Sequence, residues 1–158
     1  MTTASLPASV SLTEDALEAW GASLGRCALD SRVFVALYGP LGSGKTTLVR
    51  AACRSVGVVD DVLSPTFTLV NQYHAPEGAI YHADLYRLDE PQQLVDIGWD
   101  DLLMAEALVF VEWADRAGDW LPGERWDIRL SMGEDASTRC VAASAVGSAP
   151  PVPVPGGD

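Results

Sequence analysis

Lysine and histidine are almost missing from this sequence. Of the 10 Lys and Arg residues only Lys45 is a lysine, and the 2 histidines are His74 and His82. The 22 acidic residues leave a net charge of −12. A surface this acidic opposes broad docking on the phosphates of a nucleic acid. We therefore expect any role in nucleic-acid chemistry to be local or indirect.

Cysteine is also scarce, and long apolar runs do not occur. Cys27, Cys53 and Cys140 lie far apart and form no C-x-x-C pair, which argues against a disulfide framework and against a zinc knuckle. No apolar stretch reaches about 18 residues, and residues 1–12 lack the basic start of a secretory signal. We expect a cytoplasmic protein that makes no contact with a membrane.

Length and composition favour one globular domain. The chain has 158 residues, of which 48% are hydrophobic and 20% charged, so it is long enough for one core and too short for a two-domain enzyme. We predict a single domain over residues 1–145. Prolines at positions 150, 151, 153 and 155 predict a disordered tail over residues 146–158 that buries almost nothing.

The apolar periodicity predicts helices and strands in alternation. We expect helices over 13–29, opened by a Ser11–Glu14 capping box, over 45–56, and over 91–103 with a break at Gly98. We expect buried strands over 33–38 and 107–111, a hairpin of 66–74 with 79–84, and amphipathic strands near 125–131 and 137–143. This order predicts an α/β fold of three layers with a mixed central sheet.

One segment has a phosphate-binding pattern. Residues 39–46, Gly-Pro-Leu-Gly-Ser-Gly-Lys-Thr, match G-x-x-x-x-G-K-[ST] at every fixed position, between a buried strand and a helix. The glycines let successive N–H groups curl around a phosphate at the helix N-terminus. Lys45 would bridge the β- and γ-phosphates, and Thr46 would bind Mg²⁺. The segment predicts a P-loop NTPase-like fold with ATP and Mg²⁺ as cofactors.

Such a loop needs a carboxylate near the magnesium, at the end of a neighbouring strand. There are two candidates, Glu112 after the apolar run 108–111 and Asp84 after the extended segment 79–83. The alternative for Glu112 is an ordinary solvated strand end, and for Asp84 a turn-capping aspartate. Which of the two would polarise an attacking water stays open.

Two further features lie between the loop and these carboxylates. The Ser64-Pro65-Thr66 segment follows the P-loop helix, where many nucleotide hydrolases place a switch that senses the γ-phosphate, although a plain strand entry is the alternative. Pro65 keeps Ser64 extended and presents the Thr66 hydroxyl at a fixed place. His82 is expected to pack and hydrogen-bond within the sheet rather than to bind a metal.

Four blocks in this order resemble the TsaE (YjeE) family, the bacterial P-loop ATPases of tRNA threonylcarbamoyladenosine biosynthesis. The blocks are GPLGSGKTT (39–47), SPTF (64–67), HADLYR (82–87) and VEWADR (111–116), and the resemblance covers about residues 33–131. It implies an ATPase that works with TsaD-like and TsaB-like partners to modify adenosine 37 of tRNAs reading ANN codons, and that meets the tRNA only indirectly.

The resemblance also implies roles for individual residues. Thr66 corresponds to the switch threonine, Asp84 to a residue needed for hydrolysis, and Glu112 to the magnesium-side carboxylate, with Thr46 as the second magnesium contact. The implied nucleotide contacts are Gly39, Leu41, Gly42, Ser43, Gly44, Lys45, Thr46, Thr47 and Trp113. Pro40 stands where the family often has aspartate, and a threonine common in the family's first helix has no clear equivalent near Leu17, which leaves the adenine and ribose contacts undetermined.

Three rival functions can be weighed against an ATPase. A GTPase is excluded because the guanine-reading pattern N-K-x-D cannot form: Asn71 is the only asparagine and precedes Gln72, and Lys45 is the only lysine. A small-molecule kinase and a non-catalytic nucleotide-dependent switch remain as alternatives. Arg87 and Arg116 lie near the two carboxylates in the chain, either as internal catalytic arginines or as salt-bridge partners of those carboxylates. We expect an ATPase that is weak alone and stimulated by its partners.

Overall fold

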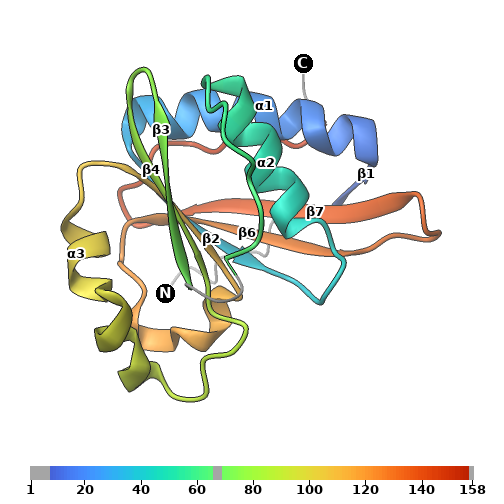
Figure 1. The fold of residues 1–158 in the computed structure, drawn as a ribbon. Helices are drawn as coiled ribbons and strands as arrows, with labels where there is room; N and C mark the ends of the chain where they lie inside the picture. The colour runs from blue at the N-terminus through green and yellow to red at the C-terminus, as the bar shows by residue number, and fades with distance from the viewer. Residues whose placement is uncertain (1–7, 66–68, 157–158) are drawn as a thin grey trace.

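The computed structural model describes residues 8–65 and 69–156, and its middle layer is a seven-stranded mixed sheet in the order β1-β7-β6-β2-β5-β4-β3. Figure 1 shows α1 and α2 over one face of the sheet and α3 on the other side. The predicted three-layer α/β fold with a mixed sheet is confirmed. The strands are β1 (Val10–Thr13), β2 (Phe34–Tyr38), β3 (Val70–Ala75), β4 (Gly78–Asp84), β5 (Leu108–Glu112), β6 (Arg125–Met132) and β7 (Thr138–Val146). The helices are α1 (Glu14–Ser31), α2 (Lys45–Ser55) and α3 (Trp99–Met104), with 3₁₀ segments η1 (Pro91–Ile97), η2 (Ala114–Arg116) and η3 (Gly118–Trp120).

The two central strands are buried on both faces. Every residue of β2 and β5 is buried, as expected for the near-continuous apolar runs of parallel strands. Val35 and Leu37 of β2 pack into the core beneath α1 and α2, whereas Phe34 and Ala36 pack into a second core with Trp99 of α3. The alternation of side chains along one strand therefore divides the interior into two cores.

Strands β4, β5, β2 and β6 run parallel to one another in the sheet. Leu37 of β2 lies opposite Glu112 of β5, and Asp84 of β4 lies opposite the same Glu112. The carboxyl ends of these strands consequently meet at one edge of the sheet, where ligands bind in open α/β folds.

Most predicted elements are present. The β3–β4 hairpin pairs antiparallel, as do β6 and β7. Gly98, with a φ of 78°, ends η1 and precedes α3, so the predicted break lies at this residue. The part of the predicted hairpin strand at 66–68 lies outside the described residues.

The first helix begins at Glu14, next to the predicted start at residue 13, but the predicted Ser11–Glu14 capping box is wrong. Ser11 belongs to β1, where it lies opposite Cys140 of β7, and it does not cap a helix. The N-cap is Thr13, whose Oγ1 accepts a hydrogen bond of 3.2 Å from the Ala16 backbone N–H. The S-x-x-E spacing was matched by chance, because pairing at the edge of the sheet decided the conformation of Ser11.

The three cysteine side chains are thiols. Cys27, Cys53 and Cys140 are all free, and burial raises the pKa of the Cys53 thiol to about 12. In the part of the chain that the structure describes, no helix is long and apolar enough to cross a membrane.

The C-terminal segment differs from the disordered tail that its prolines predicted. The indole N–H of Trp20 donates to the carbonyl of Pro153 at 2.9 Å, and that of Trp126 donates to the carbonyl of Pro150 at 2.7 Å. Ala149 and Val152 pack against the core beneath α1 and α2. Proline lacks an N–H but keeps its carbonyl acceptor, so a proline-rich segment can bind two buried tryptophans without forming a strand.

Removal of residues 147–158 should therefore destabilise the fold. Two hydrogen bonds of about 0.5–1.5 kcal/mol net each are lost, together with about 1 kcal/mol from the partial burial of Val152. We expect urea denaturation to show a free energy of unfolding lower by about 2–4 kcal/mol. A control truncation of residues 155–158 keeps both proline carbonyls as peptide carbonyls and should cost much less. Equal stability of the wild-type and the longer truncation would contradict a structural role for this segment.

Candidate functional site

The loop between β2 and α2 forms the floor of the site. It begins at Gly39, whose φ is 149° and where an added Cβ would lie 2.3 Å from the carbonyl oxygen of Leu130. It ends at Gly44, which precedes α2 with a φ of 104°, in the left-handed region that favours glycine. The sharp strand-to-helix turn predicted from the pattern is present, and the N-terminus of α2 faces the cleft.

Lys45 is the first residue of α2 and is only 4% exposed, which is rare for lysine. Its Nζ donates to the carbonyls of Gly39 at 2.6 Å and Pro40 at 2.9 Å, and lies 4.3 Å from the centre of the Trp113 ring. Burial lowers the pKa of the Lys45 ammonium, and the nearby Glu112 carboxylate acts in the opposite direction. The ammonium is thus held at the loop by weak neutral acceptors, which the oxygens of a phosphate can replace.

Thr46 and Glu112 meet across the cleft. The Thr46 hydroxyl lies 2.9 Å from Oε1 and 3.0 Å from Oε2 of Glu112, which ends β5 and is almost completely buried. Hydroxyl and carboxylate oxygens are ligands that Mg²⁺ prefers, and Mg²⁺ fills its remaining positions with water and substrate phosphate. No cluster of three or more His, Cys, Asp or Glu that could hold a metal occurs among residues 8–65 and 69–156. This donor pair therefore fits a magnesium ion that enters with a nucleotide.

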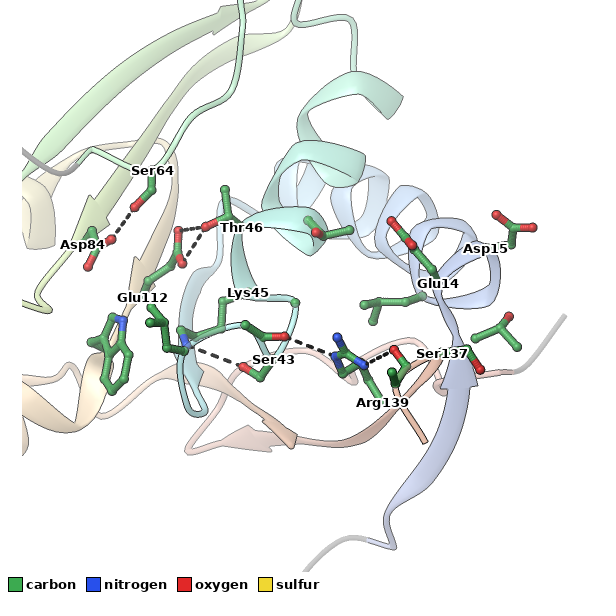
Figure 2. A pocket seen from close by; sticks show the side chains of 18 residues that line it. Glu14, Asp15, Ser43, Lys45, Thr46, Ser64, Asp84, Glu112, Ser137 and Arg139 are labelled. Carbon is green, nitrogen blue, oxygen red and sulfur yellow. Dashed lines mark hydrogen bonds between the residues drawn. The ribbon is translucent and has the colours of Figure 1, made fainter. Parts of the chain in front are cut away.

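Asp84 ends β4 beside Glu112 and faces the same cleft (Figure 2). Its Oδ1 accepts a hydrogen bond of 2.9 Å from the Tyr86 backbone N–H, and its Oδ2 accepts one from the Ser64 hydroxyl. Ser64 therefore belongs to the site through its hydrogen bond with Asp84. No local pattern in the sequence predicts this contact, because the two residues are 20 positions apart. Thr66, the predicted switch threonine, lies outside the described residues.

Trp113 follows Glu112 with an unusual backbone. Its φ of 56° and ψ of 43° place a bulky residue in the left-handed region, which costs free energy and is found most often at functional sites. Its ring packs against the ring of Tyr86, with 4.9 Å between the two ring centres, and faces the Lys45 ammonium. The predicted proximity of Trp113 to the site is therefore observed, and the turn directs its ring toward the loop.

A cleft of about 570 Å³ runs along these residues and extends beyond them. Five of the residues named above as expected nucleotide contacts line this cleft: Leu41, Gly42, Ser43, Gly44 and Thr47. The side chain of Leu41 is exposed. Figure 2 shows the side chains of Glu14, Ser137 and Arg139 at the far end, opposite Asp84 and Glu112. Arg139 donates from Nε to the carbonyl of Gly42 at 3.2 Å. No pattern in the sequence indicates that these residues belong to the site, because only the antiparallel pairing of β1, β7 and β6 brings them next to the loop.

The salt-bridge reading of Arg116 is not what the structure shows. Its Nη1 donates to the carbonyl of Leu88 at 3.1 Å, and its guanidinium lies 6.0 Å from the centre of the Trp113 ring. Within the described ranges, the carboxylate of Glu112 pairs with His82 instead, at 2.5 Å. His82 hydrogen-bonds within the sheet, as its position predicted.

Comparison with known proteins shows the family to which the chain belongs. The family model described as threonylcarbamoyl adenosine biosynthesis protein TsaE matches residues 11–141. Among curated relatives, "tRNA threonylcarbamoyladenosine biosynthesis protein TsaE" of Haemophilus influenzae is 36% identical over 107 residues, covering 68% of each chain. The protein of the same name in Treponema pallidum is 32% identical over 124 residues, covering 78% of this chain and 90% of its own.

A solved structure has the same fold. The crystal structure of Bacillus subtilis YdiB superposes with a TM-score of 0.72 and 23% identity, over 91% of this chain and 90% of that one. The family match spans most of the chain, and its range contains the loop and both carboxylates that line the cleft. The chain belongs to the TsaE family, the threonylcarbamoyl adenosine biosynthesis proteins.

Proposed function

We propose that this chain is a magnesium-dependent ATPase of tRNA threonylcarbamoyladenosine biosynthesis. It would act with TsaD-like and TsaB-like partners in the cytoplasm, on adenosine 37 of tRNAs that read ANN codons. The names of its relatives support the pathway. The observation that carries the ATPase is the meeting of Lys45, Thr46 and Glu112 at the carboxyl edge of the sheet.

Four side chains in the cleft, those of Lys45, Thr46, Asp84 and Glu112, have a chemical role in this proposal. Lys45 would exchange its loop carbonyls for phosphate oxygens, and Thr46 with Glu112 would hold Mg²⁺, which neutralises charge on the phosphates. Asp84 and Glu112 are the groups that can orient an attacking water. The hydrogen bond from Ser64 to Asp84 connects residue 64 to this carboxylate, and Thr66 remains the proposed switch threonine.

Hydrolysis must be distinguished from phosphoryl transfer and from simple sensing. ATP turnover measured with and without a panel of small phosphate acceptors separates the three. Release of inorganic phosphate without a phosphorylated acceptor supports the ATPase. A phosphorylated small molecule indicates a kinase, and nucleotide binding without any turnover, alone or with partners, indicates a non-catalytic switch.

Lys45→Ala should weaken binding of ATP in the presence of Mg²⁺. The variant loses a charge-assisted contact worth about 1.5–3 kcal/mol, so calorimetric titration should show a Kd higher by roughly tenfold to over a hundredfold. The matched control is Arg54→Ala, which removes an exposed cation from the last turn of the same helix. An unchanged Kd in Lys45→Ala would remove the loop from the proposal. Wild-type protein should also prefer ATP over GTP.

Asp84→Asn and Glu112→Gln should separate binding from hydrolysis. Each keeps the shape of the side chain but removes a negative charge needed around magnesium or water. Both variants should still bind nucleotide and should turn over far more slowly in the presence of partners. Glu106→Gln, an exposed carboxylate before the other end of β5, is the control. A variant that hydrolyses at the wild-type rate would show that its carboxylate is structural.

The isolated chain should be a poor ATPase that its partners stimulate. The Arg116 guanidinium donates to the carbonyl of Leu88, and that of Arg139 donates to the carbonyl of Gly42 in the loop. Neither is therefore placed as a free catalytic arginine. An arginine supplied in trans raises rates by about 10³–10⁵. Phosphate release should therefore rise sharply when a TsaB-like and a TsaD-like protein are added. Fast turnover by the chain alone, with no effect of the pair on rate or on tRNA modification, would contradict the proposal.

A further inference from the structure

His82 belongs to β4, and its fully buried ring lies between Glu112 of β5 and Tyr73 of β3; the proposed function gives it no role. Its Nε2 lies 2.5 Å from Oε2 of Glu112. Its Nδ1 lies 3.1 Å from the hydroxyl of Tyr73, on β3. Both ring nitrogens therefore have partners, and one of these is the carboxylate that faces Thr46.

The partners determine which nitrogen of a neutral ring holds the proton. An ionised carboxylate only accepts hydrogen bonds, so the N–H must be on Nε2, and Nδ1 must accept from Tyr73. The Asn71 amide donates to the Tyr73 hydroxyl at 3.4 Å and to the carbonyl of Leu63 at 3.3 Å. That carbonyl also lies 3.3 Å from the Tyr73 hydroxyl, so it is a second, more distant acceptor for the Tyr73 proton. With the Tyr73 proton directed to His82, its nearer acceptor, the Leu63 carbonyl still accepts from Asn71, and donation runs in one direction from Asn71 through Tyr73 and His82 to Glu112.

This chain of hydrogen bonds restrains the Glu112 carboxylate. Both of its oxygens contact the Thr46 hydroxyl, and Oε2 also accepts the imidazole N–H. Partners of this kind orient the groups that bind a metal, and their loss typically reduces metal affinity. Leu63, whose carbonyl accepts from Asn71, directly precedes Ser64, which donates to Asp84. The series of hydrogen bonds therefore also connects Ser64 with the magnesium side of the cleft.

We propose that His82 is a positioning residue, which holds Glu112 toward Thr46 and the magnesium position, and that Tyr73 in turn holds the ring. The proposal rests on the proposed function, because it assigns Mg²⁺ to this carboxylate. A purely structural histidine would support stability alone. A positioning histidine must also set the dependence of nucleotide binding on magnesium.

The test titrates Mg²⁺ into each protein in the presence of a non-hydrolysable ATP analogue and follows binding by calorimetry. In His82→Leu, which has no donor, the Mg²⁺ concentration for half-maximal binding should rise by about tenfold to a hundredfold. Binding of the analogue without metal should change little, since the loop and Lys45 are intact. His82→Gln should recover most of the loss, because its amide N–H can reach the place of Nε2. His74→Gln, at the only other histidine, is the control and should match the wild type.

A milder pair of variants tests Tyr73. Tyr73→Phe removes only the hydroxyl and should shift the Mg²⁺ dependence in the same direction by a smaller factor. Tyr81→Phe, on neighbouring β4 with its side chain in the second core, is the matched control. If His82→Leu unfolds the protein, the proposal is tested with Tyr73→Phe alone. A Mg²⁺ dependence of Tyr73→Phe equal to that of Tyr81→Phe then overturns the proposal.

A spectroscopic signature gives a readout independent of binding. The His74→Gln variant contains a single imidazole, so its ¹⁵N–¹H correlations belong to His82 alone. We expect the proton on Nε2, and a proton on Nδ1 alone would overturn the proposal because Nε2 could not then donate to Glu112.

The outcomes separate this inference from the proposed function. Wild-type protein that binds the analogue without any dependence on Mg²⁺ overturns the proposed function, and this inference with it. If the wild type binds the analogue in a Mg²⁺-dependent way and a folded His82→Leu variant has the same Mg²⁺ dependence, the inference alone is overturned.

Discussion

The parallel register of β2, β4 and β5 is the constraint on which the site depends. It places Leu37 opposite Glu112 and Glu112 opposite Asp84, so that both carboxylates and the start of the loop share one edge. Side chains alternate between the faces of a sheet, and a shift of one residue would turn Glu112 away from Thr46. The buried apolar runs of β2 and β5 stabilise this register because both faces are covered by packed layers.

Within this frame the site buries charge without leaving any polar group unpaired. Lys45, His82, Asp84 and Glu112 are all buried, and every buried side-chain nitrogen or oxygen in the described ranges has a hydrogen-bond partner. Unpaired buried charge is costly, so the protein supplies its own substitutes for a ligand. Loop carbonyls and the Trp113 ring hold Lys45, and Glu112 holds the Thr46 hydroxyl. Nucleotide binding then becomes an exchange of partners rather than the burial of new charge.

The outer half of the sheet builds the other wall of the cleft. Pairing of β1 with β7 and of β7 with β6 brings Glu14 and Arg139 to the loop from opposite ends of the chain. The C-terminal segment lies on the same side of the sheet, where it accepts hydrogen bonds from Trp20 of α1 and Trp126 of β6. Strands β1 and β7, which have no recognisable nucleotide-binding pattern, thereby contribute residues to the lining of the cleft.

Residue order along the chain was sufficient to predict the strand–loop–helix around Lys45, the Gly98 break, the hairpin and the two strand-end carboxylates. Each of these depends on contiguous patterns, since glycine conformations, apolar period and helix termini are local properties. Contacts between distant segments were not predictable in this way. His82 and Glu112 are 30 positions apart, Trp20 and Pro153 are 133 apart, and Gly42 and Arg139 are 97 apart. Only the folded sheet brings such pairs within hydrogen-bond distance, and for the C-terminal segment those contacts oppose the disorder that its composition alone predicts.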